Sequence, residues 1–226
     1  PVRVLFVTSS FGFRHDVLPE ARQVMARLGQ ELAWLDVAAT DDVQPIAGGN
    51  LRKTLEQTDV LMLYTTGRLP VDVQVLTEWI EAGGGFVGVH SATDTLSNDP
   101  AYVRLIGGIF DGHPWNEEVT LRVEHALDPI TKPFLAGQAA SGQANSGPVT
   151  FTLADEIYQF KALTPDRRVL ISLAPGNKKM EPGREYPLVW TTEIGKGRVF
   201  YSALGHRPEV WRDTRFTDHL VAGLRW

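Results

Sequence analysis

The chain has 226 residues, of which 43% are hydrophobic and 22% are charged, with a formal net charge of −5. These fractions are typical of globular proteins and exclude extensive disorder, and the length predicts one α/β domain over residues 1–226. Cysteine is absent, which excludes disulfides, thiolate metal ligands and a cysteine nucleophile.

The distribution of apolar and basic residues limits the partners. No apolar run reaches the roughly 18 residues that a membrane span needs, so no membrane association is expected. The 22 Lys and Arg residues form no basic stripe, which argues against a nucleic-acid partner. The short apolar start at residues 2–7 is not typical of a signal peptide, and together with the lack of cysteine it favours a cytoplasmic location.

Strand and helix patterns alternate along the first half of the chain. Amphipathic stripes predict helices at about 17–28 and 75–80, each followed by glycine. Short β-branched and aromatic runs predict four strands, at residues 2–8, 32–37, 59–64 and 86–89. The third of these runs is almost continuously apolar, as in a parallel strand that is covered on both faces.

The second half is richer in predicted strands and ends in a helix at about 216–224. Segments 136–148 and 174–187 are rich in Gly or Pro and predict loops. Strands are predicted at 119–123, 149–153, 168–173, 188–193 and 198–203, with a tight turn at 195–197 between the last two. The whole pattern predicts an α/β fold with one open, mostly parallel sheet, helices on both faces and added antiparallel strands.

Histidines follow several of the predicted strands. His15, His90 and His206 come after three different strand ends, and His113 follows the glycine-rich segment 107–112. Ligands of open α/β sheets bind at the carboxyl ends of the strands. We therefore expect these imidazoles to meet at one rim of the sheet.

The segment Gly88-Val89-His90-Ser91-Ala92 has the pattern of a nucleophile elbow, with His90 at its centre. Small flanking residues relieve crowding in such a turn, which presents the central side chain at the top of the sheet beside a helix N-terminus. The positive end of the helix would disfavour a protonated imidazole. A neutral imidazole serves as a metal ligand, a general base or a hydrogen-bond donor, and the alternative is a hydrogen-bonded structural residue under a loop.

Five blocks, in this order along the chain, together resemble the ThuA-like (trehalose utilisation) family. They are Gly-Phe-Arg-His at 12–15, the glycine-rich strand and elbow at 84–94, Gly-Gly-Ile-Phe-Asp-Gly-His-Pro at 107–114, Asp-Glu-Ile-Tyr at 155–158, and the segment 195–206. The resemblance covers residues 12 to about 211. It implies a flavodoxin-like sheet of the class I glutamine amidotransferase type.

In that comparison His90 stands where the amidotransferases have their cysteine, and residues 205–209 resemble their His-Pro-Glu segment with Arg207 interposed. Imidazole cannot form the acyl-enzyme of a glutaminase, so glutaminase activity is not expected. The resemblance instead implies carbohydrate metabolism, with trehalose, a related di- or monosaccharide or a keto derivative as substrate. A sugar dehydrogenase is the partner it suggests.

The expected site combines acid/base groups with groups that bind the sugar. The catalytic candidates are His90, His206 and Glu156, and the substrate-binding candidates are Arg14, His15, Asp94, His113, Trp115, Tyr158 and Glu209. Arg14 and Asp94 would orient the substrate, and Trp115 would offer a flat face to a sugar ring. His15, His90, His113 and His206 could also bind Zn, Mn, Fe or Ni, with Asp94 or Glu156 adding a carboxylate.

Several alternatives stay open. The chemistry could be that of a keto-sugar isomerase, epimerase or lyase, or of a sugar hydrolase. Ser91 could act as a serine nucleophile, and the chain could instead be a non-catalytic sugar-binding or partner-regulating module. Glu156 and Asp155 could lie on a solvated strand edge, and Trp115 could be core packing. A homodimer through a sheet edge or a helix is a common outcome for such domains.

Overall fold

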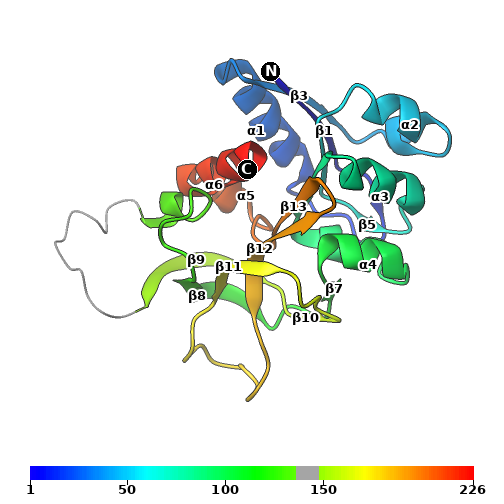
Figure 1. The fold of residues 1–226 in the computed structure, drawn as a ribbon. Coiled ribbons are helices and arrows are strands. Elements are labelled where there is room, and N and C mark those ends of the chain that lie inside the picture. The colour runs from blue at the N-terminus through cyan, green and yellow to red at the C-terminus, as the bar shows by residue number, and fades with distance from the viewer. Residues whose placement is uncertain (136–147) are drawn as a thin grey trace.

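In the computed structural model, which describes residues 1–135 and 148–226, the chain folds around a nine-stranded sheet (Figure 1). The strand order is β3-β1-β4-β6-β13-β12-β11-β8-β9. The five strands from β3 to β13 are parallel, and the pairings from β13 to β9 are antiparallel. The predicted open α/β architecture with antiparallel additions is confirmed.

The parallel strands are short and apolar, and all four residues of the central strand β4 are buried. They are β1 (Val2–Val7), β3 (Leu35–Thr40), β4 (Val60–Leu63), β6 (Gly85–Val89) and β13 (Gly197–Ser202). Strand β3 begins three residues later than predicted, because Leu32 still caps the preceding helix through its N–H bond to the carbonyl of Leu28. Burial on both faces explains why these runs read as continuously apolar.

Helices cover both faces of the sheet, with α1, α5 and α6 on one side and α2, α3 and α4 on the other (Figure 1). Their bounds are α1 (Leu18–Glu31), α2 (Asn50–Leu55), α3 (Val73–Glu81), α4 (Pro100–Ile106), α5 (Pro208–Arg212) and α6 (Thr214–Arg225). The sequence predicted α1, α3 and α6. Helices α2, α4 and α5 have five to seven residues, too few for an amphipathic period to be recognised.

Of the antiparallel strands, β11 has the predicted bounds and the other three extend further than predicted. They are β8 (Trp115–Val123), β9 (Val149–Ile157), β11 (Arg168–Leu173) and β12 (Pro187–Ile194), and β12 joins β13 through the predicted turn. Two small pairings flank the sheet, β2 (Ser10–Phe11) with β5 (Thr66–Gly67) and β7 (Ile109–Phe110) with β10 (Phe160–Lys161). Short 3-10 helices lie at η1 (Gln44–Ile46), η2 (His90–Asp94) and η3 (Lys132–Leu135). The loop predicted at 136–148 lies outside the described residues except for Pro148.

None of the helices in the described part of the chain has both the length and the apolar character needed to cross a bilayer.

A histidine is fully buried where α6 packs on the sheet. The Nδ1–H of His219 donates to the carbonyl of Ile130 at 2.8 Å, and its Nε2 lies 3.1 Å from the hydroxyl of Ser202. Because a carbonyl only accepts, Nδ1 carries the proton and Nε2 accepts from the serine. Burial lowers the pKa of His219 from 6.5 to about 4.

We expect the free energy of unfolding to fall as the pH drops from about 6.5 to about 4. In that range the unfolded chain binds a proton at position 219 that the folded chain does not, and the pKa difference corresponds to roughly 3 kcal/mol. Denaturant titrations at about pH 7, 5.5 and 4 measure this loss, and His219→Gln should make it smaller. His125→Gln is the matched control, because His125 is exposed. If the free energy of unfolding falls as steeply with pH in His219→Gln as in His125→Gln, His219 is not the source of the loss.

Candidate functional site

The turn after β6 places His90 under strain. His90 has φ +44, in the left-handed region that side chains rarely adopt. A Cβ at Gly88 would lie 2.4 Å from Cδ1 of Ile106 and 3.1 Å from Cβ of Ala92, so small residues are required on both sides of His90. The elbow geometry is therefore as predicted. The element that follows is the five-residue 3-10 helix η2 rather than an α-helix, so the expected field of a helix N-terminus is correspondingly weak there.

Four side chains from distant parts of the chain form a cluster at the carboxyl ends of the parallel strands. His15, His90, His206 and Glu156 each offer one ligand atom, and these atoms all lie within 4.8 Å of one another. Nε2 of His90 lies 3.3 Å from Nδ1 of His206 and 3.3 Å from Oε2 of Glu156. Nδ1 of His206 lies 3.2 Å from the same carboxylate oxygen. Three of the histidines expected at this rim thus meet there.

Glu156 reaches this rim because the end of β9 is tied to the loop after β13. The neighbouring Asp155 is fully buried, and its carboxylate accepts the backbone N–H of Gly205 at 2.7 Å and that of Arg207 at 3.1 Å. The side chain of Arg207 in turn donates to Asn116 on β8. The alternative of a solvated strand edge for Asp155 and Glu156 is wrong, because Glu156 is only 7% exposed.

The hydrogen bonds of His90 show which of its ring nitrogens carries a proton. Its Nδ1 lies 2.6 Å from the carbonyl of Ala203, which can only accept, so Nδ1 carries the proton. In the neutral ring Nε2 then presents a lone pair to the carboxylate of Glu156, which is also an acceptor. Nδ1 of His206 lies 3.3 Å from this nitrogen and 3.2 Å from Oε2 of Glu156, so an N–H there can donate to either acceptor, and a proton or metal ion shared between the two acceptors is the other arrangement.

The other imidazoles of the cluster favour the neutral form. Burial, and then the neighbouring His90 and His206, lower the pKa of His15 to about 3, and its buried Nδ1 has no hydrogen-bond partner. Burial is also the main cause of the lowered pKa of His206. Burial alone would raise the pKa of Glu156, but its hydrogen bond with His90 and the charges of the surrounding imidazoles lower it overall.

His113 and Tyr158 border the cluster without joining it. Nδ1 of His113 lies 3.4 Å from Oε1 of Glu156, and the side chain is half exposed. The ring of Tyr158 is buried and lies 4.0 Å from that of His90, between centroids. Among the described residues, the group with metal-ligand geometry contains three of the four candidate histidines and the candidate carboxylate Glu156, and it does not contain His113.

The remaining predicted site residues lie elsewhere. Trp115 is 1% exposed and donates its indole N–H to the carbonyl of Lys178, so it has no open face for a sugar and the platform prediction is wrong. Arg14 is exposed and forms no hydrogen bond or ion pair with the described residues. Asp94 is half-buried, which raises its pKa, and Glu209 is exposed on α5.

Ser91 lacks the environment of a nucleophile. Its hydroxyl is buried and donates to the carbonyl of Thr65 at 3.0 Å. No imidazole of the described residues is hydrogen-bonded to it, whereas a serine nucleophile needs an adjacent base. The serine-hydrolase alternative is therefore not supported by the geometry.

A cleft of about 400 Å³ opens beside the cluster. It is lined by Phe13, His15, Asp16, Val17, Glu20, Asn116, His206, Arg207 and Pro208. Phe13, Asn116 and Arg207 were not among the predicted site residues, and Asp155 was not predicted to hold the cluster together. Phe13 and Asp155 lie inside the recognised blocks, which was the available signal. Asn116 had none, because only the β8–β9 pairing brings it there.

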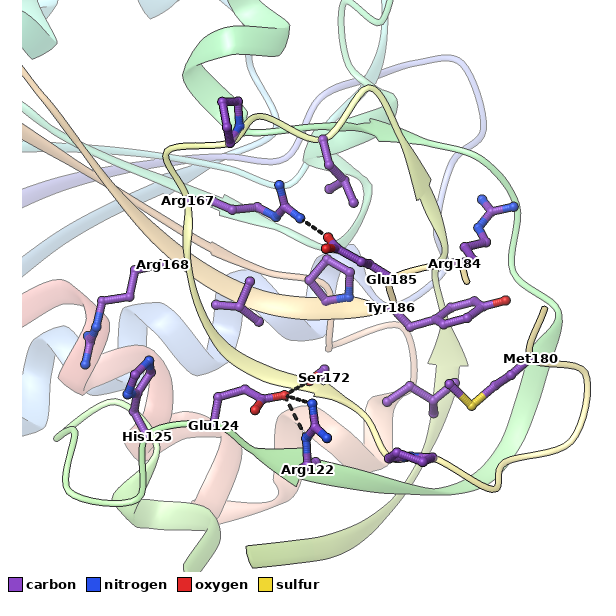
Figure 2. Close-up of a pocket in the computed structure, with 16 residues that line it drawn as sticks. Arg122, Glu124, His125, Arg167, Arg168, Ser172, Met180, Arg184, Glu185 and Tyr186 are labelled. Atoms are coloured by element: carbon purple, nitrogen blue, oxygen red, sulfur yellow. Dashed lines mark hydrogen bonds and ion pairs between the residues drawn. The ribbon is translucent and has the colours of Figure 1, made fainter. Parts of the chain in front are cut away.

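A larger hollow of about 1050 Å³ lies on the antiparallel part of the sheet (Figure 2). It contains none of the predicted site residues, and its arginines are already paired. Arg122 donates twice to Glu124, and Arg167 forms an ion pair with Glu185 (Figure 2). We therefore place the candidate site at the histidine cluster and not in this hollow.

The fold and the position of the cluster define a class of protein, a flavodoxin-like α/β domain with its polar site at the carboxyl ends of the parallel strands. The profile of the ThuA family, described as trehalose utilisation, matches residues 3–226. The chain therefore belongs to the ThuA family.

Solved structures share the fold at low sequence identity. A putative ThuA-like protein from Bacteroides uniformis has a TM-score of 0.76 and 22% identity, with 100% of this chain and 90% of that chain covered. One from Parabacteroides merdae has a TM-score of 0.70 and 18% identity, covering 100% and 89%. A β-galactosidase from Rahnella sp. R3 has a TM-score of 0.56 and 13% identity, over 98% of this chain and 30% of that one. No curated protein matches the chain.

Replacing Asp155 by Asn should destabilise the protein. The amide keeps the volume but offers only one acceptor oxygen, so one of the two backbone N–H groups in the 205–207 loop loses its partner. We expect the free energy of unfolding in denaturant to fall by about 2 kcal/mol. Asp16→Asn is the matched control, since Asp16 is exposed and unpaired among the described residues. Equal stability of the two variants contradicts a structural role for Asp155.

Proposed function

We propose that this protein binds a divalent metal ion between His15, His90 and Glu156, with His206 beside it as a free acid/base group, and that it acts on a small sugar or its keto derivative. The observation that carries the proposal is the meeting of three imidazoles and one carboxylate, with ligand atoms within 4.8 Å of one another. Membership of a family described as trehalose utilisation supports the sugar.

The residues present fit a metal ion such as Zn, Mn, Fe or Ni. The Nε2 lone pair of His90 and the Glu156 carboxylate face each other, and the buried Nδ1 of His15 has no hydrogen-bond partner, so a cation between them would meet three ligand atoms. The hydrogen bond from Nδ1 of His90 to the carbonyl of Ala203 orients the ring as a metal ligand requires. A bound divalent metal would polarise a sugar carbonyl or hydroxyl.

The exposure of each side chain divides the roles. His90 is fully buried, so it holds the site and does not touch a substrate. The side chain of His206 is 25% exposed and lines the cleft, so it is the proposed acid/base group. Glu156, which lies against Nδ1 of His206, holds that imidazole in place.

Removal of a proton next to a ketone is the step that a keto-sugar isomerase, epimerase and eliminating lyase share. His206 would take this proton while the substrate occupies the cleft. A sugar dehydrogenase partner would supply the keto form, because oxidation of a hydroxyl must precede such chemistry. A sugar-binding module without turnover is the second candidate, and the isotope experiment below separates the two.

Metal binding is tested by elemental analysis of the purified protein and by calorimetric titration with Zn²⁺ and Mn²⁺. We expect about one equivalent in the unaltered protein, and an affinity at least about 10-fold lower in Glu156→Gln and His90→Ala, since each removes a ligand. His125→Ala is the matched control, because His125 is exposed and lies outside the cluster. Equal metal affinity of the Glu156→Gln and His125→Ala variants contradicts the proposed metal site.

Proton removal is tested by NMR in D₂O with 3-keto-trehalose as the probe. We expect the unaltered protein to exchange the hydrogen next to the ketone for deuterium, and His206→Ala to slow this exchange by about 100-fold or more. The His125→Ala variant should exchange at the unaltered rate. Exchange no faster than in buffer, despite sugar binding, would favour the non-catalytic module.

A further inference from the structure

The cleft beside the cluster carries an exposed aromatic ring. Phe13 is 67% exposed, and it is one of three large hydrophobic side chains that are exposed in the described part of the chain. Its ring meets that of His15 edge to face, with centroids 4.9 Å apart, which holds it at the wall of the cleft. An aromatic ring left open to solvent beside a polar cluster suits a ligand with one apolar face and many hydroxyls.

The lining of the cleft also includes polar groups, and two of them are held in place by hydrogen bonds. Nε and Nη2 of Arg207 donate to Oδ1 of Asn116 at 3.2 and 2.6 Å, and the backbone N–H of Arg207 is bound by Asp155. Nη1 of Arg207 and the amide nitrogen of Asn116 have no hydrogen-bond partner among the described residues. The carboxylate of Asp16 is likewise unpaired there. The cleft thus offers two free donors that are held in place, on Arg207 and Asn116, and one free acceptor, on Asp16, which suits hydroxyl groups.

The charges of the cleft do not suit an anion. Its lining includes two carboxylates, Asp16 and Glu20, and one guanidinium, Arg207. The carboxylate of Glu20 is paired with Arg212, outside the lining. No excess of positive side chains is available for a phosphate group, which arginine clusters ordinarily bind. The volume of about 400 Å³ lies at the small end of ligand pockets, as a mono- or disaccharide requires.

We propose that Phe13, Asp16, Asn116 and Arg207 form a subsite for a ring of a neutral, unphosphorylated saccharide, stacked on Phe13 and bordering His206. The inference rests on the proposed function and narrows its substrate class. Asn116 lies on β8 and Arg207 on the loop after β13. The hydrogen bonds of Asp155 to the backbone of that loop therefore position the subsite as well as the histidine cluster.

Calorimetric titration of the purified protein with trehalose tests the subsite. We expect Phe13→Ala to weaken trehalose binding by about 5- to 10-fold and Phe13→Tyr to restore most of it, because stacking needs only the ring. Phe11→Ala is the matched control, since Phe11 lies two residues before Phe13, at the end of β2, is 48% exposed and does not line the cleft. Trehalose 6-phosphate should bind more weakly than trehalose.

Three results contradict the proposed subsite. They are equal trehalose affinities of the Phe13→Ala and Phe11→Ala variants, tighter binding of trehalose 6-phosphate than of trehalose, and no trehalose binding by the unaltered protein. Metal content is measured on the same samples and should be equal in the Phe13 and Phe11 variants. If the subsite test fails but the protein still binds metal, only the subsite is wrong. If the unaltered protein binds no metal, the metal site of the proposed function is wrong.

Discussion

The site depends on one buried carboxylate. Asp155 accepts two backbone N–H groups from the loop that follows β13, and it does so from the end of β9, at the far edge of the sheet. A fully buried carboxylate is costly unless it is hydrogen-bonded, so these two bonds and the position of the loop stabilise each other. They join the antiparallel half of the sheet to the carboxyl ends of the parallel half. This junction places His206, on the loop after β13, next to Glu156, on β9.

A second constraint comes from the turn at His90. The left-handed backbone of this residue and the lack of a side chain at Gly88 direct the imidazole to the rim, where the Ala203 carbonyl holds its Nδ1. The strain is offset by packing around β6, and the result is a lone pair set against a carboxylate. The turn thus places a ring nitrogen of a histidine, and not a serine or cysteine nucleophile, at the carboxyl ends of the parallel strands.

Burial then separates support from contact with substrate. His90, His15 and Glu156 are all buried, and of the two cluster residues that line the cleft, His15 and His206, only His206 is appreciably exposed. The residues that line the rest of the cleft come from the loop after β1, from α1, from β8 and from residues 207–208 at the start of α5. The solved relatives, at 22% and 18% identity, show the fold of this arrangement and not its reaction.

The sequence alone determined the layers of the fold and which strand ends carry imidazoles, because apolar periodicity and glycine placement are local properties. The parallel strands, α1, α3 and α6, the elbow at His90 and the family blocks could all be read from it. It could not show that Trp115 is covered or that Asp155 is a clamp. It also could not show that Glu156, rather than His113, lies in one cluster with His15, His90 and His206. Those facts depend on the nine-residue pairing of β8 with β9 and on the hydrogen bonds that tie the end of β9 to the loop after β13. These are contacts between segments far apart in the chain, which no local pattern encodes.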